Sequence, residues 1–209
     1  MTRAPSHWLK PPGPVADGLT IGLLGGSFNP PHEGHLHISE MALKRLGLDY
    51  VWWLVSPQNP LKSERNTQPL DKRIALATKL VDERRVIVTD VERTLGTRYT
   101  VDTLEALVKR FPKVRFIWLM GSDNLASFHL WKEWPRIVGL MPVAVVMRPG
   151  SMLAPLQAKA MQRFWNARRK HMRGFVGVVP PAFVVVGGRR NAQSSTALRA
   201  GALVETRAL

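Results

Sequence analysis

Short, unbroken runs of apolar residues recur along the chain and alternate with segments of helical spacing. We predict strands over these runs, at residues 20–26, 51–55, 86–88, 114–120, 143–147 and 183–186. Polar residues do not alternate with apolar ones inside the runs. Both faces of the resulting sheet are therefore expected to be buried beneath helices.

Between the runs, apolar residues return every three or four positions, as in an amphipathic helix. This spacing predicts helices over 33–46, 70–83 and 101–111, a very basic helix over 153–172 and a short closing helix over 195–203. Gly47 marks the end of the first helix. Strands alternating with helices predict an α/β fold, with a doubly wound, mainly parallel sheet in three layers.

The length of 209 residues suits a single domain. Residues 1–18 are rich in proline and are expected to form a flexible N-terminal lead-in, so that residues 19–209 make up the single domain. No run of 18 uninterrupted apolar residues is present, and the start of the chain lacks the apolar core of a secretory signal. We expect no membrane association and a cytoplasmic location.

Charge and cysteine content narrow the chemistry. The chain has 30 Lys and Arg against 15 Asp and Glu, a net charge of +15, and residues 151–209 contain 10 basic side chains and 1 acidic one. This surplus indicates an anionic partner without choosing among nucleic acid, phospholipid and phosphorylated small molecules. The absence of cysteine excludes disulfides, cysteine-ligated metals and cysteine nucleophiles.

Parallel sheets bind ligands beyond the carboxyl ends of their strands, so the loop after the first strand is the first place to look for chemistry. Residues 25–35 read Gly-Gly-Ser-Phe-Asn-Pro-Pro-His-Glu-Gly-His. The paired glycines allow close backbone approach to a ligand, and His32 and His35 share one side of a helix start. A strand-to-helix turn with two surface histidines would explain the histidines alone, but together with the glycines the pattern favours a phosphate site.

Other strand ends carry weaker signals, each of which has a structural alternative. Lys62 could reach a phosphate or be an ordinary surface lysine, and Asp123 could bind ribose hydroxyls or cap a helix. Ser195 or Thr196 could cap the last helix, with Arg199 one turn in, as an anion site or only as a cap. Five further residues are also of note. The backbone N–H groups of Tyr99 and Thr100 could bind a carboxylate. Trp131 could stack on a base or pack in the core, and Trp52 and Trp53 are predicted to be core residues.

Five blocks of the sequence together resemble the nicotinate mononucleotide adenylyltransferase family of the H-x-G-H nucleotidyltransferases. They are residues 25–35, the Pro-containing loop 56–62, Arg98-Tyr99-Thr100-Val101-Asp102-Thr103-Leu104, Gly121-Ser122-Asp123 followed by Trp131, and Ser194-Ser195-Thr196-Ala197-Leu198-Arg199. All occur in the family's order over about residues 20–203. Arg98 and Gln193 depart from the residues usual in the family.

The resemblance implies a Rossmann-like nucleotidyltransferase fold and transfer of AMP from ATP to nicotinate mononucleotide, giving deamido-NAD and pyrophosphate. Mg²⁺ would be carried on the ATP phosphates, without a dedicated protein cage. The resemblance assigns catalytic roles to His35, His32, Lys62 and Arg199. The ATP-binding residues would be Gly25, Gly26, Ser27, Phe28, His32, His35, Asp123, Ser195, Thr196 and Arg199, and the acceptor site would be formed by Asn29, Lys62, Tyr99, Thr100, Asp102 and Trp131.

Two other hypotheses stay open at this point. The same fold could act on nicotinamide mononucleotide, phosphopantetheine or a flavin nucleotide, because the first block does not separate these acceptors. A non-enzymatic nucleic-acid binder would use the basic stretch 163–173, but a solvated helix face explains that stretch more simply, and no nucleic-acid partner is expected. The sequence leaves the oligomeric state undetermined and allows a homo-oligomer.

Overall fold

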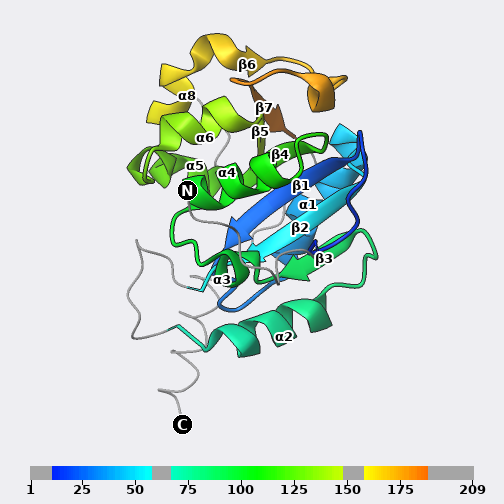
Figure 1. Ribbon diagram of the computed structural model, residues 1–209. Coiled ribbons are helices and arrows are strands. Elements are labelled where there is room, and N and C mark those ends of the chain that lie inside the picture. Colours follow the sequence, from blue (N-terminus) through cyan, green and yellow to red (C-terminus); the bar gives the residue numbers. More distant parts are fainter. Residues whose placement is uncertain (1–10, 58–66, 148–157, 188–209) are drawn as a thin grey trace.

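A single all-parallel sheet organises the computed structural model, which describes residues 11–57, 67–147 and 158–187 (Figure 1). Within these ranges, seven strands lie in the order β3-β2-β1-β4-β5-β7-β6. They are β1 (Thr20–Gly26), β2 (Tyr50–Val55), β3 (Val86–Thr89), β4 (Arg115–Gly121), β5 (Val143–Val146), β6 (Arg168–Arg169) and β7 (Phe183–Val186). The order reverses at β1, which pairs with both β2 and β4. Ligands bind at such a reversal in open parallel sheets.

Helices connect the strands and cover both sheet faces. They are α1 (Glu33–Leu46), α2 (Leu70–Leu80), α3 (Val91–Leu95), α4 (Thr100–Arg110), α5 (Ser122–Ser127), α6 (Trp134–Leu140) and α8 (Lys159–Arg163), with single 3₁₀ turns η3 (Phe128–Leu130), η4 (Trp165–Ala167) and η5 (Phe175–Gly177). In the described residues no helix is long and apolar enough to cross a membrane.

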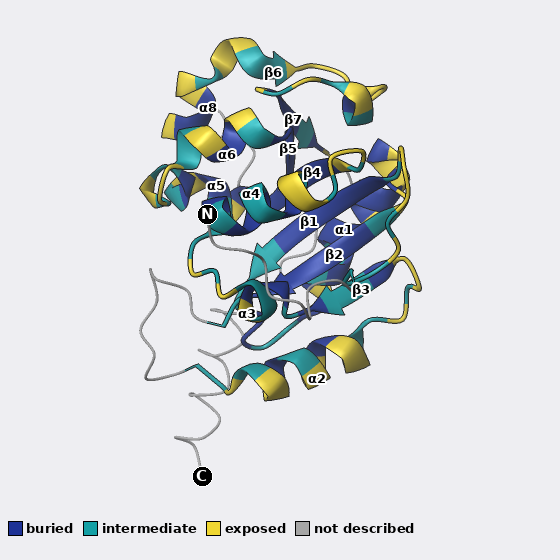
Figure 2. Ribbon diagram, viewed as in Figure 1, coloured by how far each residue is buried: buried dark blue, intermediate teal, exposed yellow. Residues whose placement is uncertain are grey.

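Alternate residues of β1 to β5 and of β7 enter two separate hydrophobic cores. In β2, Trp53 packs with α1 and α2 on one face, whereas Trp52 packs with α4 and its neighbours on the other. Both tryptophans are fully buried, which confirms that they are core residues. The central strands are buried along their length in Figure 2. This arrangement confirms the three-layer α/β prediction and explains why the strands are apolar without alternation.

The predicted strands are confirmed to within a residue or two, except that β6 was not foreseen. The long basic helix predicted over 153–172 is wrong in its described part. There, α8 ends at Arg163, the η4 turn follows, and Arg168 and Arg169 pair with β7 at the sheet edge. Packing of Phe164 against the core and this strand pairing override the local helical spacing. The closing helix predicted over 195–203 lies outside the described residues.

The last part of the predicted lead-in, residues 11–18, lies against the body of the molecule. Val15 packs on the core, and the side chain of Asp17 forms a 2.6 Å ion pair with Lys113. A Cβ on Gly13 would lie 3.0 Å from the indole nitrogen of Trp52, so the chain passes close over β2. These contacts give residues 11–18 a defined path.

Candidate active site

The end of β1 is built from glycines because a buried indole lies against it. A Cβ on Gly25 would come within 2.4 Å of the Trp118 ring, whereas one on Gly26 would meet the Phe28 ring at an ordinary 3.4 Å. Trp118 is 1% exposed and has no room to retreat. The carboxyl end of β1 is therefore bare backbone, without side chains that would obstruct a ligand.

The loop from Ser27 to His32 is held by an aromatic stack. Phe28 is buried in the left-handed backbone region, with φ of 46°, a conformation that costs a non-glycine residue of order 1–3 kcal/mol. Its ring stacks on Trp53 at 4.9 Å and lies 4.5 Å from the His35 ring. Burial of this ring offsets the backbone strain and fixes the loop beneath the histidines.

His32 and His35 cap helix α1 through their own rings. The His32 Nδ1 accepts a hydrogen bond from the Gly34 backbone N–H at 3.0 Å. The His35 Nδ1 lies 3.2 Å from the His32 backbone nitrogen and 3.3 Å from the His32 carbonyl oxygen, so it accepts from the first or donates to the second according to its tautomer. A neutral imidazole that accepts at Nδ1 carries its proton on Nε2. The ring centroids are 3.9 Å apart, so the sequence-predicted pair is brought together at the helix start.

A short chain of hydrogen bonds ties α1 to β2 below these rings. The Trp53 indole donates to the Ser39 hydroxyl at 2.8 Å, and that hydroxyl donates to the His35 carbonyl at 3.0 Å. Trp53 and Ser39 are both fully buried. The position of His35 is therefore set by the packed interior and not by the loop alone.

Arg73 is a second organiser, which the sequence did not reveal. Its buried guanidinium donates to the carbonyls of Ser27 (2.6 Å), Ser56 (2.7 Å), Pro57 (3.0 Å) and Gln68 (2.8 Å). Burial lowers its pKa from the ordinary value. One side chain of α2 thus fastens the loop after β1, the loop after β2 and the start of its own helix.

Glu92, in α3, is a buried carboxyl group behind the β2 loop. It is 6% exposed, and burial raises its pKa to about 7, although a hydrogen bond with the Ser56 side chain acts in the opposite direction. Ser56 therefore links two buried ionisable groups, since its side chain hydrogen-bonds to Glu92 and its carbonyl accepts from Arg73. The five-residue helix α3 is too short to show helical periodicity, so Glu92 could not be placed from the sequence pattern.

A second group of predicted residues gathers at the start of α4. Tyr99 is the N-cap residue, and Thr100 begins the helix. The ammonium of Lys132 lies 4.3 Å from the Tyr99 ring centroid and 3.8 Å from the Asp102 carboxylate. The sequence predicted Tyr99 and Asp102 but missed Lys132, which comes directly after the predicted Trp131.

Trp131 connects this group to the β1 loop. Its half-buried ring meets the Trp118 ring edge-on, with centroids 6.0 Å apart, and Trp118 is the residue that lies against Gly25. The Trp118 indole therefore lies between Trp131 and the end of β1. Trp131 also packs edge-on against Phe128, so part of its ring belongs to the core, as the structural alternative held.

The remaining predicted residues divide into those described and those not. Asp123 is exposed in the first turn of α5, which follows β4 directly. It lies at the carboxyl end of β4, next to the carboxyl end of β1, where Gly26 lies. The Asn29 side chain accepts a 3.3 Å hydrogen bond from the Gln68 backbone. The rest, namely Lys62, Ser195, Thr196 and Arg199, lie outside the described residues.

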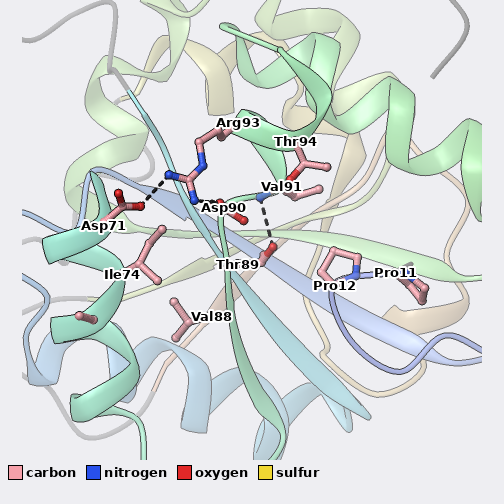
Figure 3. A pocket seen from close by; sticks show the side chains of 11 residues that line it. Pro11, Pro12, Asp71, Ile74, Val88, Thr89, Asp90, Val91, Arg93 and Thr94 are labelled. Atoms are coloured by element: carbon pink, nitrogen blue, oxygen red, sulfur yellow. Dashed lines mark hydrogen bonds and ion pairs between the residues drawn. The ribbon is translucent and has the colours of Figure 1, made fainter. Parts of the chain in front are cut away.

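A hollow of about 590 Å³ lies elsewhere, between α2, α3, β3 and the lead-in (Figure 3). Its lining includes Pro11, Ile74 and Val88 and the ion pair of Arg93 with Asp71. None of the predicted site residues lines it. In the parts of the chain that the structure describes, no group of three or more His, Asp and Glu side chains is arranged to hold a metal ion.

Comparison with known proteins agrees with this geometry. The model of the cytidylyltransferase-like family matches residues 23–201. A protein named probable nicotinate-nucleotide adenylyltransferase from Parvibaculum lavamentivorans is 48% identical over 189 residues, which cover 88% of this chain and 93% of that protein. One of the same name from Methylorubrum extorquens (strain PA1) is 50% identical over 183 residues, covering 87% and 99%.

Solved structures share the fold at low sequence identity. The nicotinic acid mononucleotide adenylyltransferase of Plasmodium falciparum, complexed with NaAD, superposes with a TM-score of 0.66 at 16% identity, covering 87% of this chain and 83% of that one. This likeness confirms the Rossmann-like architecture inferred from the strand order.

Proposed function

Since the chain belongs to the nicotinate-nucleotide adenylyltransferase family of cytidylyltransferase-like nucleotidyltransferases, we propose that it transfers AMP from ATP to nicotinate mononucleotide. Deamido-NAD and pyrophosphate are the products, as part of NAD biosynthesis. The observation that supports this most directly is the paired capping of α1, in which the Nδ1 atoms of His32 and His35 both face backbone groups at the start of the helix. In the tautomers that accept at Nδ1, both rings carry a proton on Nε2, and we assign these Nε2–H groups to phosphate oxygens at the switch point of the sheet.

The transfer is a direct in-line displacement. An oxygen of the acceptor phosphate bonds to the α-phosphorus of ATP, while the bond from that phosphorus to the bridging oxygen breaks and its electron pair leaves with pyrophosphate. The acceptor phosphate is ionised at neutral pH, so no general base is needed and no covalent enzyme intermediate forms. The protein acts by positioning and by stabilising charge.

We assign His35 to the α-phosphate and His32 to the neighbouring phosphates. Gly25, Gly26 and Ser27 line the nucleotide with backbone, Phe28 supports the histidines, and Asp123 receives the ribose hydroxyls. Four further predicted residues complete this site by holding the β- and γ-phosphates and the leaving pyrophosphate: Lys62, Ser195, Thr196 and Arg199. Mg²⁺ enters with ATP, coordinated by its phosphates and by water.

The acceptor site lies at the start of α4. The backbone N–H groups of Tyr99 and Thr100 receive the pyridine carboxylate, and the Lys132 ammonium, 4.3 Å from the Tyr99 ring, adds positive charge there. Trp131 stacks on the pyridine ring, and Asn29 and Asp102 complete the site. Positive charge at this point favours the acid over nicotinamide mononucleotide, whose amide is neutral.

The test is pyrophosphate release from ATP with nicotinate mononucleotide, nicotinamide mononucleotide and phosphopantetheine, each supplied in turn. We expect turnover with the acid and a kcat/KM for the amide at least about tenfold lower, the scale of one lost charge contact. Preference for the amide would overturn the choice of acceptor. Release with none of them would overturn the proposed function.

A further inference from the structure

One described segment, residues 158–187, carries only positive charge. It contains six cationic side chains and neither Asp nor Glu: Lys159, Arg163, Arg168, Arg169, Lys170 and Arg173. Elsewhere Arg85, Arg93 and Arg136 each form an ion pair with a carboxylate, whereas none of the six does so with any described residue. Within the described chain, their charge is left for a partner from outside.

The fold of this segment excludes the simpler explanation of a solvated helix face. α8 ends at Arg163, the chain turns through η4, and β6 adds to β7 at the open edge of the sheet. Figure 2 shows this part of the molecule, around α8 and β6, as largely exposed. The cations therefore spread over a turn and a sheet edge.

Aromatic rings accompany the cations on this surface. Trp165 is 52% exposed, which is unusual for so large an apolar side chain, and the guanidinium of Arg168 lies 5.3 Å from its ring centroid. The guanidinium of Arg163 lies 5.5 Å from the Trp134 ring. An exposed indole beside flat guanidinium groups is the combination on which nucleic-acid bases stack.

A shallow hollow completes the surface. Its volume is about 280 Å³, and its lining is Arg163, Phe164, Asn166, Ala167, Arg169 and Pro181. Two guanidinium groups and an amide suit a phosphate group. Pro181 precedes β7, so the hollow lies at the amino end of that strand, whereas the candidate active site lies at the carboxyl ends. It is therefore a separate site.

We propose that this surface binds the backbone of a single-stranded nucleic acid. Arg163 and Arg169 hold one phosphate in the hollow, and a neighbouring base stacks on Trp165. A strand is favoured over a free nucleotide because the cations continue past the hollow to Lys170 and Arg173. The inference does not depend on the proposed function and replaces the expectation that no nucleic acid binds.

The test is fluorescence anisotropy of a labelled oligouridine of about 20 nucleotides, a length that covers one or two typical single-strand sites, titrated with the full chain. R163A/R169A should weaken binding about tenfold at about 0.15 M salt and reduce the slope of log K against log salt by about 1.4, the value for two lost phosphate contacts. W165A should weaken binding about 5- to 160-fold, and W165F should retain most of the affinity.

The matched control is K72A/K79A, which removes the same charge from exposed positions of α2, at the opposite edge of the sheet. It should leave the salt slope unchanged, and all these variants should retain pyrophosphate release. The proposal is wrong if the wild-type chain does not bind the oligonucleotide at this salt, or if K72A/K79A weakens binding as much as R163A/R169A. It is also wrong if AMP competes as effectively as the unlabelled oligonucleotide at equal nucleotide concentration.

Discussion

The guanidinium of Arg73 lies 2.6 Å from the backbone carbonyl of Ser27, although 46 positions separate the two residues in the chain. Through this bond, α2 on the outside of the sheet holds the loop that carries His32 and leads into α1, where His35 lies. The same guanidinium also holds the loop after β2, through the carbonyls of Ser56 and Pro57. The candidate active site is thus assembled by a side chain that none of the sequence motifs contains.

Replacing Arg73 by methionine should lower the free energy of unfolding by about 3 kcal/mol, because buried carbonyl groups lose their donors. Arg73→Lys should lose less stability, but an ammonium has only three N–H groups for four acceptors, so pyrophosphate release should still fall. Urea unfolding and turnover below the unfolding transition measure both effects. Arg84→Met, at an exposed arginine, serves as the control; equal stability of R73M and the wild-type chain would contradict the role of Arg73.

His35→Ala should reduce turnover by about 10²–10³, which is the scale for loss of one transition-state donor. The fold should survive, because His35 is only half-buried and the interior bond from Trp53 ends on Ser39, not on the imidazole. Steady-state kinetics and far-ultraviolet circular dichroism would be measured on the same preparation. A folded variant with near-normal turnover would remove His35 from the mechanism.

The buried carboxyl group of Glu92 should make the stability of the fold depend on pH. Its pKa is about 7 in the folded chain, against an ordinary value of 4.5, so the folded state binds more protons between these limits. The contribution of Glu92 to the free energy of unfolding is fully present below about pH 4.5. It decreases by about 3 kcal/mol as the pH rises to about 7. Glu92→Gln has no carboxyl to titrate. The difference in free energy of unfolding, E92Q minus wild type, should therefore rise from pH 5 to pH 8, and a difference independent of pH would exclude the assignment.

Lys132→Met should raise the KM for nicotinate mononucleotide about tenfold and leave the KM for ATP unchanged. The ammonium group contacts Tyr99 and Asp102, at the start of α4, and removing it takes positive charge from the proposed carboxylate site. Lys109→Met, exposed in the last turn of α4, is a matched control. Parallel changes in both KM values would show that Lys132 acts on the fold and not on the acceptor.

Patterns within one segment were enough to predict part of this site. Apolar runs gave the central strands, and the spacing of His32 and His35 gave their shared helix start. Arg73 and Glu92 could not be predicted, because their roles depend on partners that are distant in sequence. The prediction of a basic helix over 153–172 is wrong in its described part for a related reason, since pairing of Arg168 and Arg169 with β7 decides the local structure there.

The end of β1 offers a comparison of two neighbouring glycines. Gly25→Ala should lower the free energy of unfolding by about 2 kcal/mol, because the new methyl group would lie 2.4 Å from the buried Trp118 ring. Gly26→Ala meets Phe28 at 3.4 Å and should change stability by less than about 0.5 kcal/mol. Urea unfolding of both variants measures the difference.

A double-mutant cycle with Trp118→Phe identifies the cause of the Gly25 effect. The atoms nearest the new methyl group belong to the six-membered ring of the indole, and a phenylalanine side chain does not extend as far. G25A should therefore cost less in the W118F background than in the wild-type chain, with a coupling energy of about 1 kcal/mol. Strict additivity would mean that the Trp118 indole does not impose glycine at position 25.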